Sequence, residues 1–140
     1  MKKVLFLLLF LAGCSVSRPN FDKAKVEING RIKLDVEVAK TQKQKAFGLM
    51  FQKSLKQDKG MIFIYNGSKP IAMWMKNTYI PLDMFFANDN GVIFKIVENA
   101  QPLSLDLIKS GKKVTYVLET NAGFAKRYGI KVGDFLKIKD

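Results

Sequence analysis

The alternation of apolar and polar residues is clearest near the start of the folded part of the chain. Val26 and Ile28 alternate with charged residues, and the apolar residues at 32, 34, 36 and 38 continue this period of two. Asn29-Gly30 between them is a favoured two-residue hairpin turn, because both central positions of that turn need a positive φ. A period of two indicates strands with one buried side and one wet side. The pattern therefore predicts a β-hairpin from residue 25 onward.

The pattern changes at Thr41. Thr41 and Gln44 form a capping-box sequence, in which both side chains bind free backbone N–H groups at a helix start. Apolar residues between 46 and 50 follow, so a short helix that packs on the core is predicted. Gly48 within it costs about 1 kcal/mol relative to alanine. This cost favours a close contact between Gly48 and a neighbouring element.

Several short apolar runs follow the helix, and most are separated by turn residues. They are predicted to be strands, at residues 61–65, 71–75, 82–87, 92–97, 114–118 and 135–138. The runs between 61 and 97 are apolar enough to suggest central strands buried on both faces. A second short helix is predicted to begin with Thr120 or Asn121 as its N-cap and to end at Gly129.

These elements lack the strand–helix–strand alternation of parallel sheets. The predicted fold is a mainly antiparallel α+β domain, a small closed or partly open β-barrel of seven to eight strands with two short helices. Residues 25–140 are long enough for one such domain and too short for two.

The first residues have the composition of an export signal. Lys2 and Lys3 precede an uninterrupted apolar run, and small residues then lead to Cys14, as at bacterial lipoprotein cleavage sites. The run is shorter than the roughly 20 residues that a spanning helix needs. We expect residues 1–13 to be a lipoprotein signal peptide, residues 14–24 to be a tether, and Cys14 to carry the lipid. Ser15 follows the cysteine, which is typical of lipoproteins of the outer membrane that face the periplasm.

Composition limits the chemistry. The chain has no histidine and one cysteine, so imidazole catalysis, histidine-ligated metals and disulfides are excluded. No cofactor is expected. The formal net charge is +12, or +10 without the two lysines of the signal. Because the lysines are scattered along the chain, a solvated basic surface is favoured over a nucleic-acid site, and nucleic acid is not an expected partner.

The strongest concentration of unusual residue types lies between 73 and 83. It holds the single tryptophan, Trp74, and the polar triplet Lys76-Asn77-Thr78 before Pro81, where one strand is linked to the next. Asn77 and Thr78 can also simply fix a turn through bonds to their own backbone. Asp83 is predicted to point away from its apolar strand neighbours, toward solvent, a lysine or backbone N–H groups.

Glu119 is the second notable carboxylate, at the predicted end of a strand just before a helix. A negative charge is favoured there by about 0.3–1 kcal/mol, which is a sufficient structural reason for it. Alternatively, Asp83 and Glu119 converge with Lys76 near one barrel mouth, as a catalytic pair or a ligand site. The methionines at 50, 61, 73, 75 and 84 are an alternative soft-metal set, but core filling is the more common role, and no metal site is expected.

Successive motifs resemble the uncharacterised "domain of unknown function 192" family. They include Gly48-Leu49-Met50, Trp74 to Thr78, Ile80 to Asp83 and Tyr116 to Glu119. The resemblance covers nearly the whole domain from about Val26 and implies a compact β-rich fold, often exported or membrane-attached, with no agreed activity. The family usually has one arginine before the Gly-Leu-Met element and another after it, whereas this chain has Lys45 and Lys53 nearby.

The favoured hypothesis is a lipid-anchored, non-enzymatic module of the cell envelope. It would bind a small molecule, a glycan or an envelope protein through Trp74, Lys76, Asn77, Thr78, Asp83 and Glu119. One alternative is a hydrolase or transferase that uses Asp83 and Glu119 as catalytic residues. The separation of those two carboxyl groups discriminates between them, because glycosidase pairs lie about 5–9.5 Å apart. A third hypothesis is an assembly protein whose basic face meets anionic partners.

Overall fold

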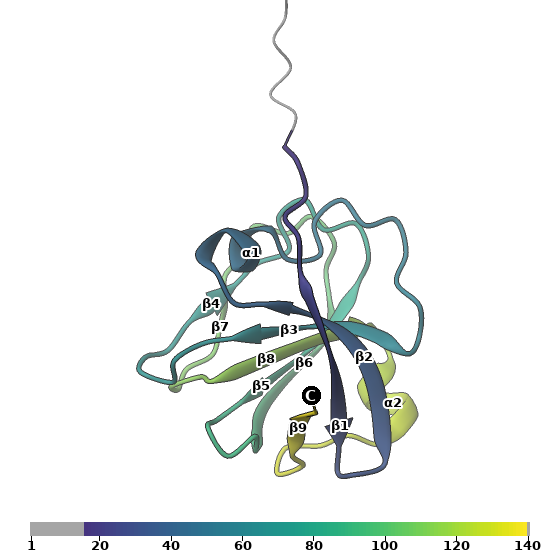
Figure 1. Ribbon diagram of the computed structural model, residues 1–140, viewed down its shortest axis with the longest axis vertical. Helices are drawn as coiled ribbons and strands as arrows, with labels where there is room; N and C mark the ends of the chain where they lie inside the picture. Colours follow the sequence, from purple (N-terminus) through teal and green to yellow (C-terminus); the bar gives the residue numbers. More distant parts are fainter. Residues whose placement is uncertain (1–15, 140) are drawn as a thin grey trace, which may run out of the picture.

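The computed structural model describes residues 16–139, which form a strongly curled β-sheet with loops and one helix over its outer side (Figure 1). The predicted signal peptide and Cys14 lie outside the described residues. Within 16–139, no helix is both long and apolar enough to cross a membrane.

Seven strands form the main sheet in the order β6-β5-β8-β3-β2-β1-β9, and β4 pairs with β7 in a separate two-stranded ribbon. The strands are β1 (Asp22–Ile28), β2 (Ile32–Ala39), β3 (Lys59–Ile64), β4 (Ala72–Met73), β5 (Leu82–Ala87), β6 (Ile93–Ala100), β7 (Ile108–Lys109), β8 (Tyr116–Asn121) and β9 (Leu136–Lys139). The helices are α1 (Gln42–Phe47) and α2 (Phe124–Tyr128). The predicted β-rich α+β fold is confirmed.

The sheet curls until its two ends meet. An isolated bridge joins Val92, just before β6, to Phe135, just before β9. The Ile93 N–H donates to the Asp134 carbonyl at 2.8 Å beside it, and the Leu136 N–H donates to the Gly91 carbonyl at 2.9 Å. The architecture is therefore a small, partly open barrel, which leaves little unpaired strand edge at this seam.

The local signals at the start of the domain are confirmed. β1 and β2 pair antiparallel through the Asn29-Gly30 turn, whose two residues have φ of 52° and 65°. Gln44 N–H donates to Thr41 Oγ1, and the Thr41 N–H donates to Gln44 Oε1, which completes the capping box. A Cβ on Gly48 would lie 3.2 Å from the Phe63 ring, so the glycine does allow close packing. Its expected place within the helix was wrong, because α1 ends at Phe47 and Gly48 is its C-cap, with a φ of 50°.

Three further expectations were wrong. No strand–helix–strand unit was expected, but β2, α1 and β3 form one. β2 and β3 are therefore parallel, because α1 and the following loop carry the chain back to the same end of the sheet. β6 is at the end of the strand order and is only partly buried, whereas β5 is buried throughout as expected for a central strand. The N-cap of α2 is Gly123 with no side-chain bond, because β8 continues through Thr120 and Asn121.

The main sheet has a separate apolar core on each face. The inner core receives side chains from all seven strands and from α2, including Leu34, Ile62, Phe85 and Leu118. The outer core lies over β3, β5 and β8, and its main residues are Leu49, Met61, Phe63, Met75, Met84 and Phe86. Because side chains alternate along a strand, neighbouring residues of one strand belong to different cores.

Candidate functional site

The segment 74–81 links β4 to β5, and its residues 74–78 form a tight turn. The Thr78 N–H donates to the Met75 carbonyl at 3.1 Å, and Thr78 Oγ1 donates to the Lys76 carbonyl at 3.1 Å. Asn77 has a positive φ of 52°, which asparagine tolerates better than most residues. Met75 and Thr78 are buried, whereas Trp74 and Lys76 are exposed.

Asn77 holds this turn against the loop after α1. Its carbonyl accepts a hydrogen bond from the Phe51 N–H at 2.9 Å, and its Nδ2 lies 3.9 Å from Met50 Sδ. Asn77 therefore positions the turn, which is the structural alternative to ligand binding that the sequence analysis also gave for it.

A cavity of about 80 Å³ lies between this turn, α1 and the outer face of the sheet. Four of the six predicted ligand-binding residues line it: Trp74, Lys76, Thr78 and Glu119. We call this space the Trp74 cavity. Asn77 and Asp83 are not among its lining residues.

Glu119 reaches the cavity from the middle of β8. It pairs with Met61 of β3 and Met84 of β5, so its side chain lies on the outer face of the sheet beside two methionines. Glu119 is 4% exposed, and no hydrogen bond to its carboxyl group is found within residues 16–139. Within the same residues, every side-chain oxygen that is completely shielded from solvent has a hydrogen-bond partner. The Glu119 oxygens have no partner there, so they are not completely shielded and border the cavity.

Burial raises the pKa of Glu119 from 4.5 to about 8. The apolar surroundings disfavour the charged form of the carboxyl group. Burial, with the charge of Glu119 second, raises the pKa of the neighbouring Tyr65 to about 12. At neutral pH, Glu119 is therefore mainly a neutral acid that can both donate and accept a hydrogen bond.

The other side chains around the cavity are aromatic and basic. The Trp74 side chain is among the exposed large hydrophobic groups, with Lys76 Nζ 5.0 Å from the centre of its ring. Lys45 Nζ donates to the Ile64 carbonyl at 3.2 Å and lies 4.5 Å from the centre of the Tyr65 ring. Tyr65 and Lys45 were not among the predicted site residues. Their signal was weak, because Tyr65 ends an apolar run and Lys45 is one of many lysines.

Asp83 lies on the opposite face of the sheet. It pairs with Thr120, one position beyond Glu119, so the two carboxylates point to different faces. Asp83 is fully buried and accepts hydrogen bonds from the Asn99 N–H and from the Ala125 N–H near the start of α2, both at 2.9 Å. The convergence of Asp83 with Glu119 and Lys76 was therefore wrong, and the two carboxyl groups cannot act as a catalytic pair.

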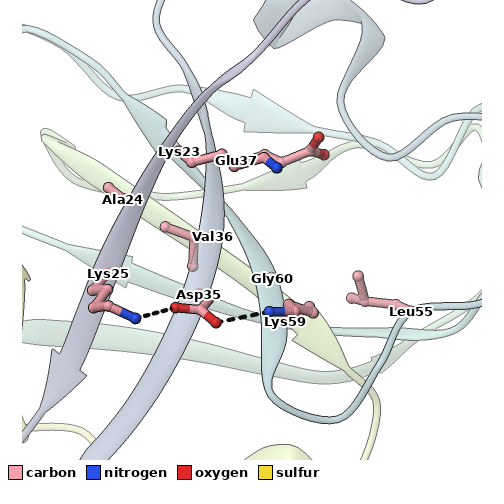
Figure 2. Close-up of a pocket in the computed structure, with 9 residues that line it drawn as sticks. All are labelled: Lys23, Ala24, Lys25, Asp35, Val36, Glu37, Leu55, Lys59 and Gly60. Atoms are coloured by element: carbon pink, nitrogen blue, oxygen red, sulfur yellow. Dashed lines mark hydrogen bonds and ion pairs between the residues drawn. The ribbon is translucent and has the colours of Figure 1, made fainter.

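The outer side of β1, β2 and β3 carries a larger groove of about 650 Å³ (Figure 2). Asp35 lies in its middle, 2.6 Å from Lys25 Nζ and 2.7 Å from Lys59 Nζ. Hydrogen bonds from Lys25 and then Lys59 lower the pKa of Asp35 to about 2. This groove is open, and these three charges already neutralise one another in part, so it is a weaker candidate site than the Trp74 cavity.

No group of three histidine, cysteine, aspartate or glutamate side chains suited to a metal ion occurs within residues 16–139. Met61, Met73, Met75 and Met84 all belong to the outer core. They fill space between the strands and the loops, as methionine commonly does.

Comparison with known proteins agrees with this architecture. The chain belongs to the DUF192 family, described as "Uncharacterized ACR", which matches residues 24–138. A search of curated proteins found no match.

Two solved structures are similar. One is a candidate transcription regulator from Sinorhizobium meliloti, with a TM-score of 0.83 and 42% identity over 87% of this chain and 98% of that one. The other is a protein of unknown function from Novosphingobium aromaticivorans, with a TM-score of 0.77 and 35% identity over 82% of this chain and 84% of that one.

Proposed function

We propose that this protein is a lipid-anchored domain of the cell envelope that binds a hydroxyl-bearing ligand, such as a sugar, in the Trp74 cavity. The ligand would place one small polar group in the cavity and stack a ring on Trp74. The domain would act by binding, without chemical conversion of the ligand.

The buried carboxyl group of Glu119 is the observation that supports this function. A buried ionisable group without a partner is unfavourable for folding and is usually satisfied by the protein itself. Glu119 instead opens into a cavity bordered by an exposed tryptophan. Buried ionisable groups with shifted pKa values occur preferentially at functional sites.

The size and polarity of the cavity define the ligand class. A volume of about 80 Å³ admits a group of a few heavy atoms, such as a hydroxymethyl or an amide, but not a whole ring. A neutral Glu119 can donate to and accept from a hydroxyl group. Trp74 is exposed enough to stack on the ring that carries the hydroxyl, as aromatic residues do in many ligand sites.

The envelope location rests on the sequence before Cys14. The basic start, the short apolar run and the small residues before the cysteine support lipidation at Cys14. With Ser15 next to it, we propose an outer-membrane anchor that leaves the domain in the periplasm. Residues 16–21, which precede β1, lie on the same side of the domain as the loops (Figure 1).

Binding can be followed through Trp74, because it is the only tryptophan in the chain. We would titrate the protein with short oligomers of N-acetylglucosamine and record its fluorescence. We expect a saturable change at neutral pH that weakens as the pH rises through about 8, because the ionised Glu119 can no longer donate a hydrogen bond.

Two substitutions separate the cavity from the rest of the surface. Glu119→Gln keeps a donor and an acceptor, so binding should persist and lose its pH dependence. Glu119→Leu removes both and should weaken binding about tenfold. The exposed Glu98→Gln is the matched control and should behave like the parent.

Duplex DNA is a second useful probe, given the description of the Sinorhizobium meliloti relative. Binding of DNA that is unaffected by Glu119→Leu, with no response to a panel of neutral sugars and polyols, would refute the proposed function.

A further inference from the structure

Exposed apolar side chains are concentrated on one group of loops. Among the ten large hydrophobic residues exposed within 16–139, five lie on the loop after α1, the β4–β5 loop and the β6–β7 loop, in addition to Trp74. They are Phe51 (42%), Tyr79 (49%), Leu103 (57%), Leu105 (65%) and Leu107 (59%). We call these five residues the loop patch. Exposed apolar patches of this kind commonly mark interaction sites.

Hydrogen bonds join the three loops into one layer. The Phe51 N–H donates to the Asn77 carbonyl at 2.9 Å, and the Leu103 N–H donates to the Thr78 carbonyl at 3.0 Å. The rings of Phe51 and Tyr79 pack edge-on with their centres 6.0 Å apart. The β6–β7 loop then exposes a leucine at every second position, 103, 105 and 107.

Two residues of the patch have a strained backbone. Five residues other than glycine have a positive φ within the described chain, and three of them are asparagines. The other two are Phe51, with a φ of 63°, and Leu103, with a φ of 65°. Large apolar residues rarely adopt this conformation, and strained residues occur preferentially at functional sites. The fold holds these two side chains outward although neither burial nor local preference favours it.

The tether is bound to the domain beside these loops. Asn20 accepts a hydrogen bond from Gln44 Nε2 of α1 at 2.7 Å, and Arg18 pairs with Glu37 of β2. The ring of Phe47 at the end of α1 lies 5.8 Å from that of Phe51 in the patch. Figure 1 shows the tether joining the domain on the side of the α1–β3 loop. From Arg18, four residues reach back to Cys14, at most roughly 14 Å.

Charge around the patch suits an anionic surface. The three loops, 48–58, 74–81 and 101–107, contain three lysines, Lys53, Lys56 and Lys76, and two acidic residues, Asp58 and Asp106. Asp58 lies 3.8 Å from Lys59 Nζ of β3, so its charge is partly compensated. Lysines beside a membrane surface are each favoured by about 1 kcal/mol when the lipids are anionic.

We propose that the loop patch docks onto the lipid bilayer that holds the anchor, with Phe51, Tyr79 and the three leucines in the interfacial region. This inference rests on the proposed lipidation of Cys14. A short, bound tether and an apolar patch beside it together hold the domain in one orientation.

The acylated full-length protein, purified from membranes, would be reconstituted into vesicles of equal parts phosphatidylcholine and phosphatidylglycerol with brominated acyl chains. Bromine quenches tryptophan only at short range, and Trp74 adjoins the patch in sequence. We expect strong quenching in the parent and at least a threefold loss in the Leu105→Ser/Leu107→Ser double variant. Both side chains are more than half exposed, so the fold should be kept, which circular dichroism would check.

Val132→Ser is the matched control, since Val132 is equally exposed at 59% but lies between α2 and β9. It should be quenched like the parent.

Vesicle flotation separates the two proposals. If the parent does not float and carries no acyl chain, lipidation is refuted and the docking falls with it. If the parent floats but is not quenched, or if the double variant is quenched like the parent, docking alone is refuted.

Discussion

Asp83 and Glu119 lie one register step apart on neighbouring strands, yet their surroundings are opposite. Asp83 faces the inner core and receives two backbone hydrogen bonds at 2.9 Å. Glu119 faces the outer core among methionines and receives none within the described residues, and burial raises its pKa to about 8.

The difference follows from what covers each face. On the inner face, α2 and the end of β6 bring free backbone N–H groups to Asp83, and the carboxylate ties both segments to β5. On the outer face, loops and α1 bring apolar side chains and leave the Trp74 cavity. Burial alone therefore does not distinguish a structural carboxylate from a candidate functional one. The partners of the carboxylate do.

The largest effect is expected from Asp83→Ala. This change leaves the N–H groups of Asn99 and Ala125 without an acceptor in a buried place and should lower the free energy of unfolding by about 4 kcal/mol. Urea denaturation would measure it. Asp83→Asn keeps one acceptor oxygen and should cost about half as much. A loss below about 1 kcal/mol in the alanine variant would mean that Asp83 does not hold α2 in place.

A smaller effect, a gain of stability at high pH, is expected when Glu119 is replaced. Its pKa is 4.5 when exposed and about 8 when folded, so the folded state binds more protons between these values. The contribution of Glu119 to stability is therefore fully present below pH 4.5 and is lost as the pH rises to about 8. The full difference is roughly 5 kcal/mol at 1.36 kcal/mol per pH unit, and water in the cavity should reduce it to about 3 kcal/mol.

Glu119→Gln should remove this pH dependence and leave the protein more stable than the parent at pH 9. Denaturation series at several pH values would compare the two proteins. Parallel curves for parent and variant would show that Glu119 is ionised at neutral pH and would contradict its raised pKa.

The smallest effect is expected at Asp35, a third carboxylate that is exposed and ion-paired. Lys25 and Lys59 lower its pKa to about 2, so its contribution is present above pH 3.8 and is lost as the pH falls toward 2. Exposed ion pairs contribute little, because water and salt screen them. Asp35→Asn should leave the unfolding midpoint at pH 7 nearly unchanged. A large decrease would show that the groove of Figure 2 is more organised than its exposure indicates.

Local signals in the sequence predicted local structure well. The Asn29-Gly30 turn, the Thr41 capping box and the close packing at Gly48 all depend on residues within a few positions, or on a missing side chain, and all three are confirmed. The predicted α2 cap was wrong because pairing with β5 extends β8 through Thr120 and Asn121, which were expected to start the helix. Long-range pairing outweighed a weak local preference there.

By itself, the sequence determined the β-rich fold class, the family signature and the excluded chemistry, since these depend on residue types and short spacings. The residue types also identified four of the predicted ligand-binding residues that line the cavity, Trp74, Lys76, Thr78 and Glu119. Only the tertiary structure decided that these four share a cavity and that Asp83 does not. The physical reason is the register of β5 against β8: a shift of one residue moves a side chain to the other face of a sheet, and no local pattern specifies that register.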